Sequence, residues 1–224
     1  MKTRIVLISL LALYFALAVV PAMAQDLYDN GSTNGNTDAW TINFGYVVSD
    51  TFRVCCNGAN GGISPDSTIS GATFAMWLFP GDSLTSAELS ITSSENGGTS
   101  YFDQTVNFTQ SGCVGNEYGY NVCNESTSFS GPTLNAGTYW VNLQNASVPS
   151  GDPIYWDENS GPSSASESSV GTIPSESFTM LGSSSTSSST SSSTTGTVPE
   201  PSSIMLFGSG ILGLAGVLRR RFHL

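Results

Sequence analysis

Histidine and basic residues are nearly absent from the body of the sequence. The single histidine is His223, and five of the six basic residues lie in the first four or the last six positions, which leaves Arg53 alone between them. Without histidine or lysine in the body, a Ser-His-Asp or Cys-His catalytic site and a Ser-Lys dyad are excluded there. Histidine-ligated zinc is excluded for the same reason.

The scarcity of basic residues also makes the body strongly acidic. All 17 Asp and Glu residues lie between Asp26 and Glu200, and the whole chain of 224 residues has a formal charge of −11. Such a surface repels phosphate backbones, so nucleic acid is not expected as a partner. The same charge favours solubility and attracts divalent cations.

The first two dozen residues have the pattern of a secretory signal peptide. A short basic segment precedes an apolar run from Ile5 to Val20, and small residues follow at Ala22 and Ala24. This small-x-small pattern predicts that signal peptidase cleaves before Gln25, after the Sec machinery has exported the chain. The alternative, an uncleaved anchor, is disfavoured because the cleavage pattern lies at the right distance from the apolar run. Residues 1–24 are therefore the expected signal peptide.

The other end of the chain has two further segments. Residues 182–197 are almost entirely Ser and Thr, without an apolar residue that could build a core, which predicts a disordered linker. In the tail, residues 198–224, an apolar run over 202–218 predicts a transmembrane helix. The residues around that run are a short extended motif, Val198, Pro199, Glu200 and Pro201, and a stop-transfer cluster, Arg219, Arg220 and Arg221.

This order of motif, apolar helix and arginine cluster resembles the PEP-CTERM sorting signal of Gram-negative bacteria. The resemblance implies that exosortase, a membrane protease, cleaves near Pro199-Glu200-Pro201. It also implies that the inner membrane is a transient stop on the way to the cell surface or the extracellular polysaccharide. The alternative is a permanent tail anchor. The resemblance covers residues 198–224 only, so it predicts a destination and not an activity.

The body, residues 25–181, has the periodicity of antiparallel strands. Apolar residues alternate with polar ones over 41–48, 73–78, 88–92, 102–108 and 139–144. Turn sequences such as Asn-Gly-Gly at 96–98 separate these runs. The pattern predicts an all-β domain, an antiparallel β-sandwich of jelly-roll-like type, with an immunoglobulin-like sandwich as the alternative. Blocks such as Trp77–Asp82 also resemble cargo domains that carry this sorting tail, but this weaker resemblance implies no activity.

Four cysteines in an exported chain suggest disulfides, because the compartment is oxidising. They are Cys55, Cys56, Cys113 and Cys123. A bond between the two adjacent cysteines would strain the backbone. A Cys113–Cys123 bond would close a hairpin-like loop and leave the adjacent pair over. We favour two cross-links from the Cys55/Cys56 segment to the other two cysteines, with the partners open.

Aromatic residues beside amides and carboxylates suggest a sugar-binding surface, since a ring stacks on the apolar face of a sugar while polar groups bond its hydroxyls. The alternative is that these rings belong to the core. The candidate sugar-binding residues are Trp140, Asn142, Gln144, Tyr155 and Trp156. Calcium is a second candidate ligand, because acidic residues cluster in loop-like segments. The candidate calcium ligands are Asp26, Asp29, Asp38, Asp152 and Asp157.

The sequence favours a protein that is not an enzyme and has no cofactor other than calcium. The leading hypothesis is a structural protein of the cell surface or the extracellular matrix, associated with exopolysaccharide or biofilm. A second hypothesis is a carbohydrate-binding module that recognises exopolysaccharide. The third, a polysaccharide-processing enzyme, has less support because neither Asp157 with Glu158 nor Glu88 with Asp103 is set at a glycosidase separation by the sequence.

Overall fold

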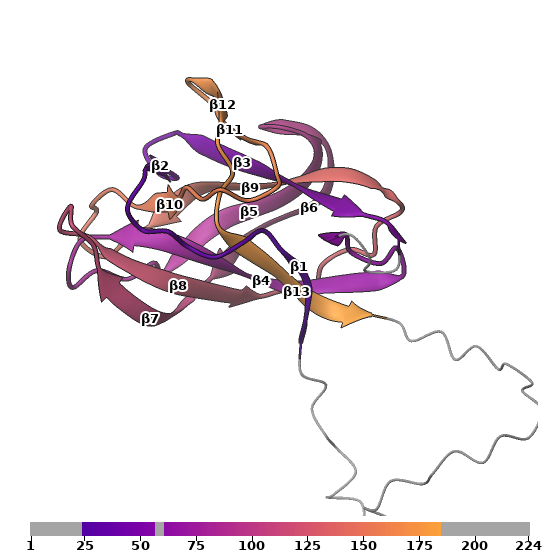
Figure 1. Cartoon of the computed structure of the whole chain (residues 1–224), viewed down its shortest axis with the longest axis horizontal. Helices are drawn as coiled ribbons and strands as arrows, with labels where there is room; N and C mark the ends of the chain where they lie inside the picture. The colour runs from indigo at the N-terminus through magenta and orange to yellow at the C-terminus, as the bar shows by residue number, and fades with distance from the viewer. Residues whose placement is uncertain (1–23, 57–60, 185–224) are drawn as a thin grey trace, which may run out of the picture. The chain divides into compact units, whose positions relative to one another are not determined.

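The computed structural model describes residues 24–56 and 61–184, and these form an all-β domain (Figure 1). The described residues contain thirteen strands in two antiparallel sheets, which confirms the predicted fold class at that level. The signal peptide, nearly all of the Ser/Thr linker and the sorting tail lie outside the described residues. Within the described ranges, no helix has the length and apolar character needed to cross a membrane.

The first sheet is built around its longest strand, β4. Strand β8 pairs with one edge of β4, and β13 and β10 share the other edge. Strand β1 then pairs with β13, β2 with β10, and β7 with β8. The bounds are β1 (Gln25–Asp29), β2 (Ala39–Thr41), β4 (Ser67–Leu78), β7 (Thr109–Gly115), β8 (Asn121–Ser128), β10 (Tyr155–Asp157) and β13 (Phe178–Ser184).

The second sheet has the order β12-β11-β3-β9-β5-β6. Strands β5, β6 and β9 correspond to alternating runs of the sequence. The longest pairings in this sheet join β3 to β9, β9 to β5 and β5 to β6. The bounds are β3 (Val47–Val54), β5 (Ser86–Ser94), β6 (Gly97–Asn107), β9 (Gly137–Ser147), β11 (Ala165–Glu167) and β12 (Gly171–Ile173).

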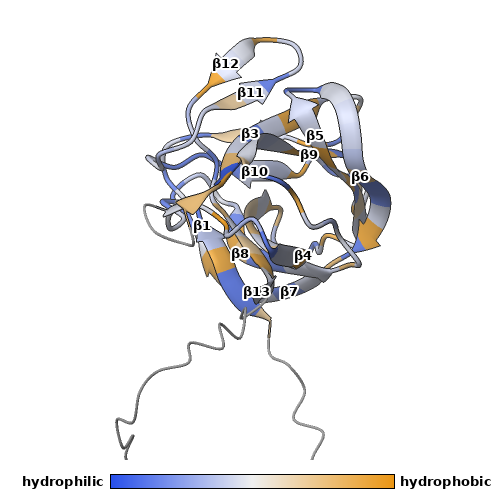
Figure 2. Cartoon of the chain, turned by 90° about the vertical axis from the view of Figure 1, so that its right-hand side faces the viewer, coloured by the Kyte–Doolittle hydropathy of each residue, from blue (hydrophilic) through white to orange (hydrophobic). Residues whose placement is uncertain are grey.

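The core lies between the sheets because each long strand turns its apolar face inward. In Figure 2 strands β3, β5, β9 and β6 lie in one layer, and β4, β8, β13 and β7 lie in the other. The ring centroids of Tyr28 in β1 and Phe52 in β3 are 6.4 Å apart, so they join the two layers. The rings of Phe74, Trp156 and Phe178 come from three strands of the first sheet and pack against one another in the core.

The sequence pattern is misleading over residues 41–48, where one continuous strand was predicted. Strand β2 ends at Thr41 and β3 begins only at Val47. Between them Phe44 and Gly45 have φ angles of 58° and 90°, and the Tyr46 amide donates to the Asn43 carbonyl at 3.2 Å. This turn passes the chain from one sheet to the other, so the aromatic residues that completed the alternation are exposed.

The disulfide expectation is also corrected. Cys113 in β7 and Cys123 in β8 are bonded, and Cys55 and Cys56 are free thiols. The favoured cross-links from the Cys55/Cys56 segment were therefore wrong, and the hairpin alternative is the one that the structure has. The reason is topological: β7 and β8 are antiparallel neighbours, so their cysteines meet across one hairpin, while Cys55 directly follows β3 in the other sheet.

Candidate functional site

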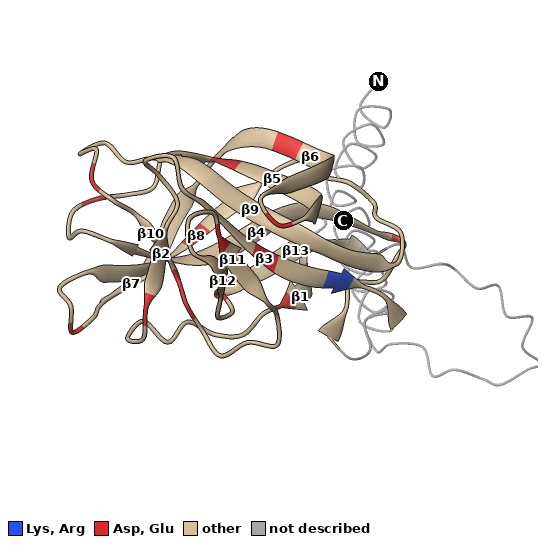
Figure 3. Cartoon of the chain, turned by 90° about the horizontal axis from the view of Figure 1, so that it is seen from above, with Lys and Arg blue, Asp and Glu red and all other residues tan. Residues whose placement is uncertain are grey.

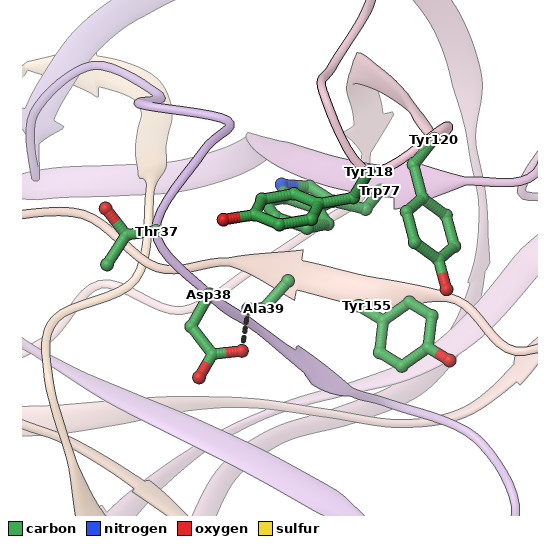
Figure 4. A pocket seen from close by; sticks show the side chains of 7 residues that line it. All are labelled: Thr37, Asp38, Ala39, Trp77, Tyr118, Tyr120 and Tyr155. Carbon is green, nitrogen blue, oxygen red and sulfur yellow. Dashed lines mark hydrogen bonds between the residues drawn. The ribbon is translucent and has the colours of Figure 1, made fainter.

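An open cavity of about 340 Å³ lies on the outer face of the first sheet, and aromatic side chains dominate its lining (Figure 4). The strands β4 and β10 supply its base, the β7–β8 hairpin one wall, and the segment before β2 the other. Its lining residues are Thr37, Asp38, Ala39, Trp77, Tyr118, Tyr120 and Tyr155. We call this cavity the aromatic pocket.

Trp77 faces the aromatic pocket because its neighbours in β4 face the core. Met76 and Leu78 are buried between the sheets, and the alternation of the strand turns the Trp77 side chain outward. Outside the sheet it meets Tyr118, whose ring is nearly parallel to it with centroids 5.6 Å apart. Trp77 is 6% exposed and Tyr118 is 56% exposed. The stack therefore presents the tyrosine ring to solvent on a supported base.

The β7–β8 turn holds the two tyrosines in place. The side-chain oxygen of Asn116 accepts hydrogen bonds from the backbone amides of Tyr118 and Tyr120, at 3.1 and 2.9 Å. Gly119 between them has a φ angle of 85°, a conformation that favours glycine. The Cys113–Cys123 bond closes the same hairpin below the turn. The local sequence thus builds a compact loop that displays aromatic rings.

The carboxylate of Asp157 holds the segment before β2, which forms the wall opposite the β7–β8 hairpin. The carboxylate accepts a hydrogen bond from the Trp77 indole at 2.5 Å and three more from the segment before β2. Those three donors are the Thr33 hydroxyl and the amides of Asn34 and Gly35. Burial raises the pKa of Asp157, and the four hydrogen bonds oppose that rise. This carboxylate therefore organises the aromatic pocket and is already occupied by donors of the protein.

The polar groups of the aromatic pocket include three phenols, the Thr37 hydroxyl and the Asp38 carboxylate. Burial, together with the neighbouring Tyr120, raises the pKa of Tyr155 to about 12, so its hydroxyl stays protonated at neutral pH. The carboxylate of Asp38 is exposed, and one of its oxygens accepts the Ala39 amide at 2.8 Å. Aromatic faces beside hydroxyls and a carboxylate suit a polyhydroxylated ligand such as a sugar.

The predicted sugar-binding residues divide among three places. Tyr155 lines the aromatic pocket. Trp140, Asn142 and Gln144 share the outer face of β9 in the other sheet, as their spacing predicts. Trp156 is fully buried, with its ring against Phe74 at 5.2 Å and its indole donating to the Ser177 carbonyl. The expectation of an exposed Trp156 ring is therefore corrected, because the inward position of this short strand belongs to Trp156 and not to Tyr155.

Trp77, Tyr118 and Tyr120 were not predicted as site residues. Trp77 alternates with core residues in the sequence, which hides its outward role. The signal that could have found the tyrosines is the Asn-Glu-Tyr-Gly-Tyr sequence at 116–120, where two aromatics flank the glycine of a turn. Aromatic residues in an exposed turn have no core to enter, so they are candidates for binding.

The predicted calcium ligands do not form one cluster. Within residues 24–56 and 61–184, no group of three or more His, Cys, Asp or Glu side chains is placed to hold a metal ion. Asp26 and Asp29 lie on the exposed edge strand β1, and Asp157 is engaged by its four donors. Asp38 and Asp152 each belong to a different loop. Acidic residues are spread over the domain in Figure 3, and Arg53 in β3 is the one basic residue within 24–56 and 61–184.

No solved structure and no curated protein sequence shows significant similarity to this chain. Comparison with known families gives a match to the PEP-CTERM protein-sorting motif over residues 197–221. The match contains the Pro-Glu-Pro sequence, the apolar run and the arginine cluster that carried the resemblance. The chain therefore carries a PEP-CTERM protein-sorting motif, the mark of an exported protein that exosortase sorts to the cell surface or the extracellular space.

Proposed function

We propose that the exported domain is a structural component of the cell surface or extracellular matrix that holds exopolysaccharide at the aromatic pocket. The observation that carries the proposal is the exposed ring of Tyr118, stacked on Trp77 and flanked by phenol hydroxyls. A supported ring of this kind offers its free face to the C–H groups of a sugar, and the hydroxyls around it bond the sugar's own. This makes the structural and carbohydrate-binding hypotheses two parts of one role.

The remaining expectations belong to the same proposal. The protein reaches its place through the Sec machinery, signal peptidase and a transient stage in the inner membrane, and it acts in the biofilm matrix without catalysis or a cofactor. The jelly-roll-like arrangement is proposed on the support of two antiparallel sheets with a common core. Exopolysaccharide lies outside the cell, where the sorting route delivers the protein. Recognition of that polysaccharide needs no catalytic group.

The experiment uses the exported protein recovered from the surface or culture fluid of its host. Immobilised exopolysaccharide from the same host is the probe. Tyr118→Ala removes the exposed ring from a turn, away from the core, and we expect a loss of binding of about tenfold or more, the scale of a lost stacking contact. Tyr46→Ala is the matched control, because Tyr46 is also an exposed tyrosine in a turn and does not line the pocket.

Equal binding by the two variants would overturn the role of the aromatic pocket. Circular dichroism of both variants shows whether the fold is kept, and thermal unfolding shows whether their stability is matched. A protein with no affinity for the host polysaccharide would overturn the proposal as a whole.

A further inference from the structure

A second cavity, of about 200 Å³, lies on the outer face of the other sheet. It is formed where β3, β9, β5 and β6 run side by side, and the β5–β6 turn closes one side. We call it the polar cavity. Its lining residues are Val47, Glu88, Ser90, Thr92, Asn96, Gly97, Gly98, Ser100, Asp103, Asn142 and Gln144.

Strand register sets the side chains of the polar cavity in rows. Ser49, Asn142, Ser90 and Asp103 are partners across β3, β9, β5 and β6. In the next row Gln144 is the partner of Glu88. Glu88 and Ser90 in β5 and Asn142 in β9 alternate with core residues along their strands, so these side chains face outward. Asp103 in β6 is exposed.

The floor of the polar cavity is already ordered without a ligand. The Asn142 amide accepts from the Ser49 hydroxyl at 2.6 Å and donates to the Thr92 and Ser90 hydroxyls at 2.9 and 3.1 Å. Glu88 accepts from the side-chain amides of Gln144 and Asn145 at 2.7 and 2.8 Å. These bonds fix the positions of the groups around them, which lowers the entropy lost when a ligand binds.

The turn beside the polar cavity keeps it open. Asn96, Gly97 and Gly98 all have positive φ angles, and the backbone amide of Asn96 donates to the Ser49 hydroxyl at 3.1 Å. The φ angle of Gly98 is 88°, a conformation that favours glycine. The turn therefore contributes the backbone of two glycines and the side chain of Asn96 to the rim.

The chemistry of the lining selects the ligand class. Hydroxyls, amides and the two carboxylates of Glu88 and Asp103 line the cavity, and none of the lining residues in the described part of the chain is basic. Such groups bond the hydroxyls of a neutral sugar, while a uronic acid would meet like charge. The outward Trp140 is in register with Thr92 at the border of the cavity, which adds a ring next to the polar rows.

The two cavities open on opposite faces of the domain. In the first sheet Trp77 and Tyr155 point away from the core, because Met76 and Trp156 are buried between the sheets. In the second sheet Asn142 points away from the core, because Val141 and Leu143 are buried. Both sheets, stacked about 10 Å apart, therefore separate the cavities. A short saccharide cannot reach from one to the other through the domain.

From this geometry we infer that the domain is a cross-linker of neutral polysaccharide, with one chain in the aromatic pocket and a second in the polar cavity. The inference rests on the proposed function for the first of these sites. Two sites on opposite faces convert a monomer into a bridge, and many bridges convert a polysaccharide solution into a network by multivalent attachment. A matrix protein with this arrangement needs no enzymatic activity to stiffen its surroundings.

A bridging assay tests the inference with the exported protein. Beads carry the neutral fraction of the host exopolysaccharide, the protein is added, and capture of the same fraction in free, fluorescent form is measured. The wild type is expected to bind the beads and capture free polysaccharide. Glu88→Gln with Asp103→Ala is expected to leave bead binding through the aromatic pocket and to reduce capture about tenfold or more. Glu95→Gln, an exposed acid of the same turn outside the lining, is the control.

The outcomes separate the inference from the proposed function. Wild-type capture by the Glu88/Asp103 variant would overturn the polar cavity as a site and leave the aromatic pocket untouched. Full bead binding and full capture by Tyr118→Ala would overturn the proposed function instead. Capture of alginate in preference to the neutral fraction would overturn the ligand class. Light scattering measures the oligomeric state, and bridging that disappears only when a dimer dissociates would overturn the two-site monomer.

Discussion

The side-chain amide of Asn30 donates a hydrogen bond to the carboxylate of Asp50 at 3.1 Å, in the interior between the two sheets. Asn30 follows β1 of the first sheet and Asp50 lies in β3 of the second, and neither side chain is exposed. Tyr28 donates to the Asn30 side-chain oxygen at 2.7 Å, and the Glu176 amide donates to Asp50 at the same distance. A polar bridge therefore joins two layers that are otherwise held by apolar packing.

Removal of the Asn30 amide should destabilise the domain more than its size suggests. Asn30→Ala leaves the Tyr28 hydroxyl without a buried partner and removes one of the donors to the Asp50 carboxylate, and we expect a loss of about 2–4 kcal/mol in the free energy of unfolding. Urea unfolding followed by tryptophan fluorescence measures it. Asn107→Ala, an exposed asparagine at the end of β6, serves as the control. Equal losses in the two variants would show that the bridge contributes nothing specific.

The domain should lose stability as the pH rises. Burial raises the pKa of Asp50 to about 7 and that of Glu125 to about 7. Since the folded state binds these protons more tightly than the unfolded state, the contribution is fully present below about pH 4 and is lost as the pH rises through about 7. Urea midpoints measured from pH 4 to pH 9 should therefore fall. Glu125→Gln should flatten the curve, and midpoints that rise with pH would contradict the sign.

Replacement of the buried carboxyl of Glu176 should increase the stability of the domain. Glu176 is fully buried, and neither of its side-chain oxygens has a hydrogen-bond partner among the residues that the structure describes. Burial and the neighbouring Asp50 raise its pKa well above the usual value. We expect Glu176→Met to increase the free energy of unfolding by about 1–3 kcal/mol at pH 8, because it removes an unpaired ionisable group from the interior. A smaller gain at pH 5 than at pH 8 is the accompanying signature, and a loss at pH 8 would contradict the argument.

The long strands could be predicted from the sequence because their periodicity alone decides which side faces inward. Phe74, Met76 and Leu78 repeat over three positions, and all three lie in the core. Strand β10 has only three residues, so the sequence Tyr155-Trp156 cannot show which ring is inward. That choice depends on the neighbours β4 and β2, which come from distant parts of the chain.

The aromatic pocket could be predicted only in part for the same reason. The sequence predicts Tyr155 as a site residue because it is close to the carboxylate of Asp157. In the structure that carboxylate accepts a hydrogen bond from Trp77, which lies in a strand distant in sequence. Strands β7 and β8 contain Gly, Ser and Asn at many positions, so they lack an apolar alternation. Their pairing, which sets the positions of Tyr118 and the Cys113–Cys123 bond, depends on the sheet. The local sequence offers only the turn at 116–120 and the hairpin-like cysteine spacing as signals.

The Cys113–Cys123 bond should support both stability and the aromatic pocket. It closes a loop of ten residues in sequence separation, and its loss through Cys113→Ala with Cys123→Ala is expected to cost about 2–3 kcal/mol in the free energy of unfolding. Because the same hairpin carries Tyr118 and Tyr120, binding to host exopolysaccharide should weaken as well. Urea unfolding and the bead assay measure the two effects on the same preparation.

The free thiols supply the control for that prediction. Cys56 is exposed and Cys55 is half-buried, so Cys55→Ser with Cys56→Ser should leave the hairpin, and therefore sugar binding, unchanged. Alkylation of the folded protein without a reductant, followed by mass spectrometry, should modify Cys56 and neither Cys113 nor Cys123. Labelling of Cys113 under these conditions would mean that the hairpin is not closed by a disulfide, and the expected coupling between that bond and Tyr118 would then have no physical basis.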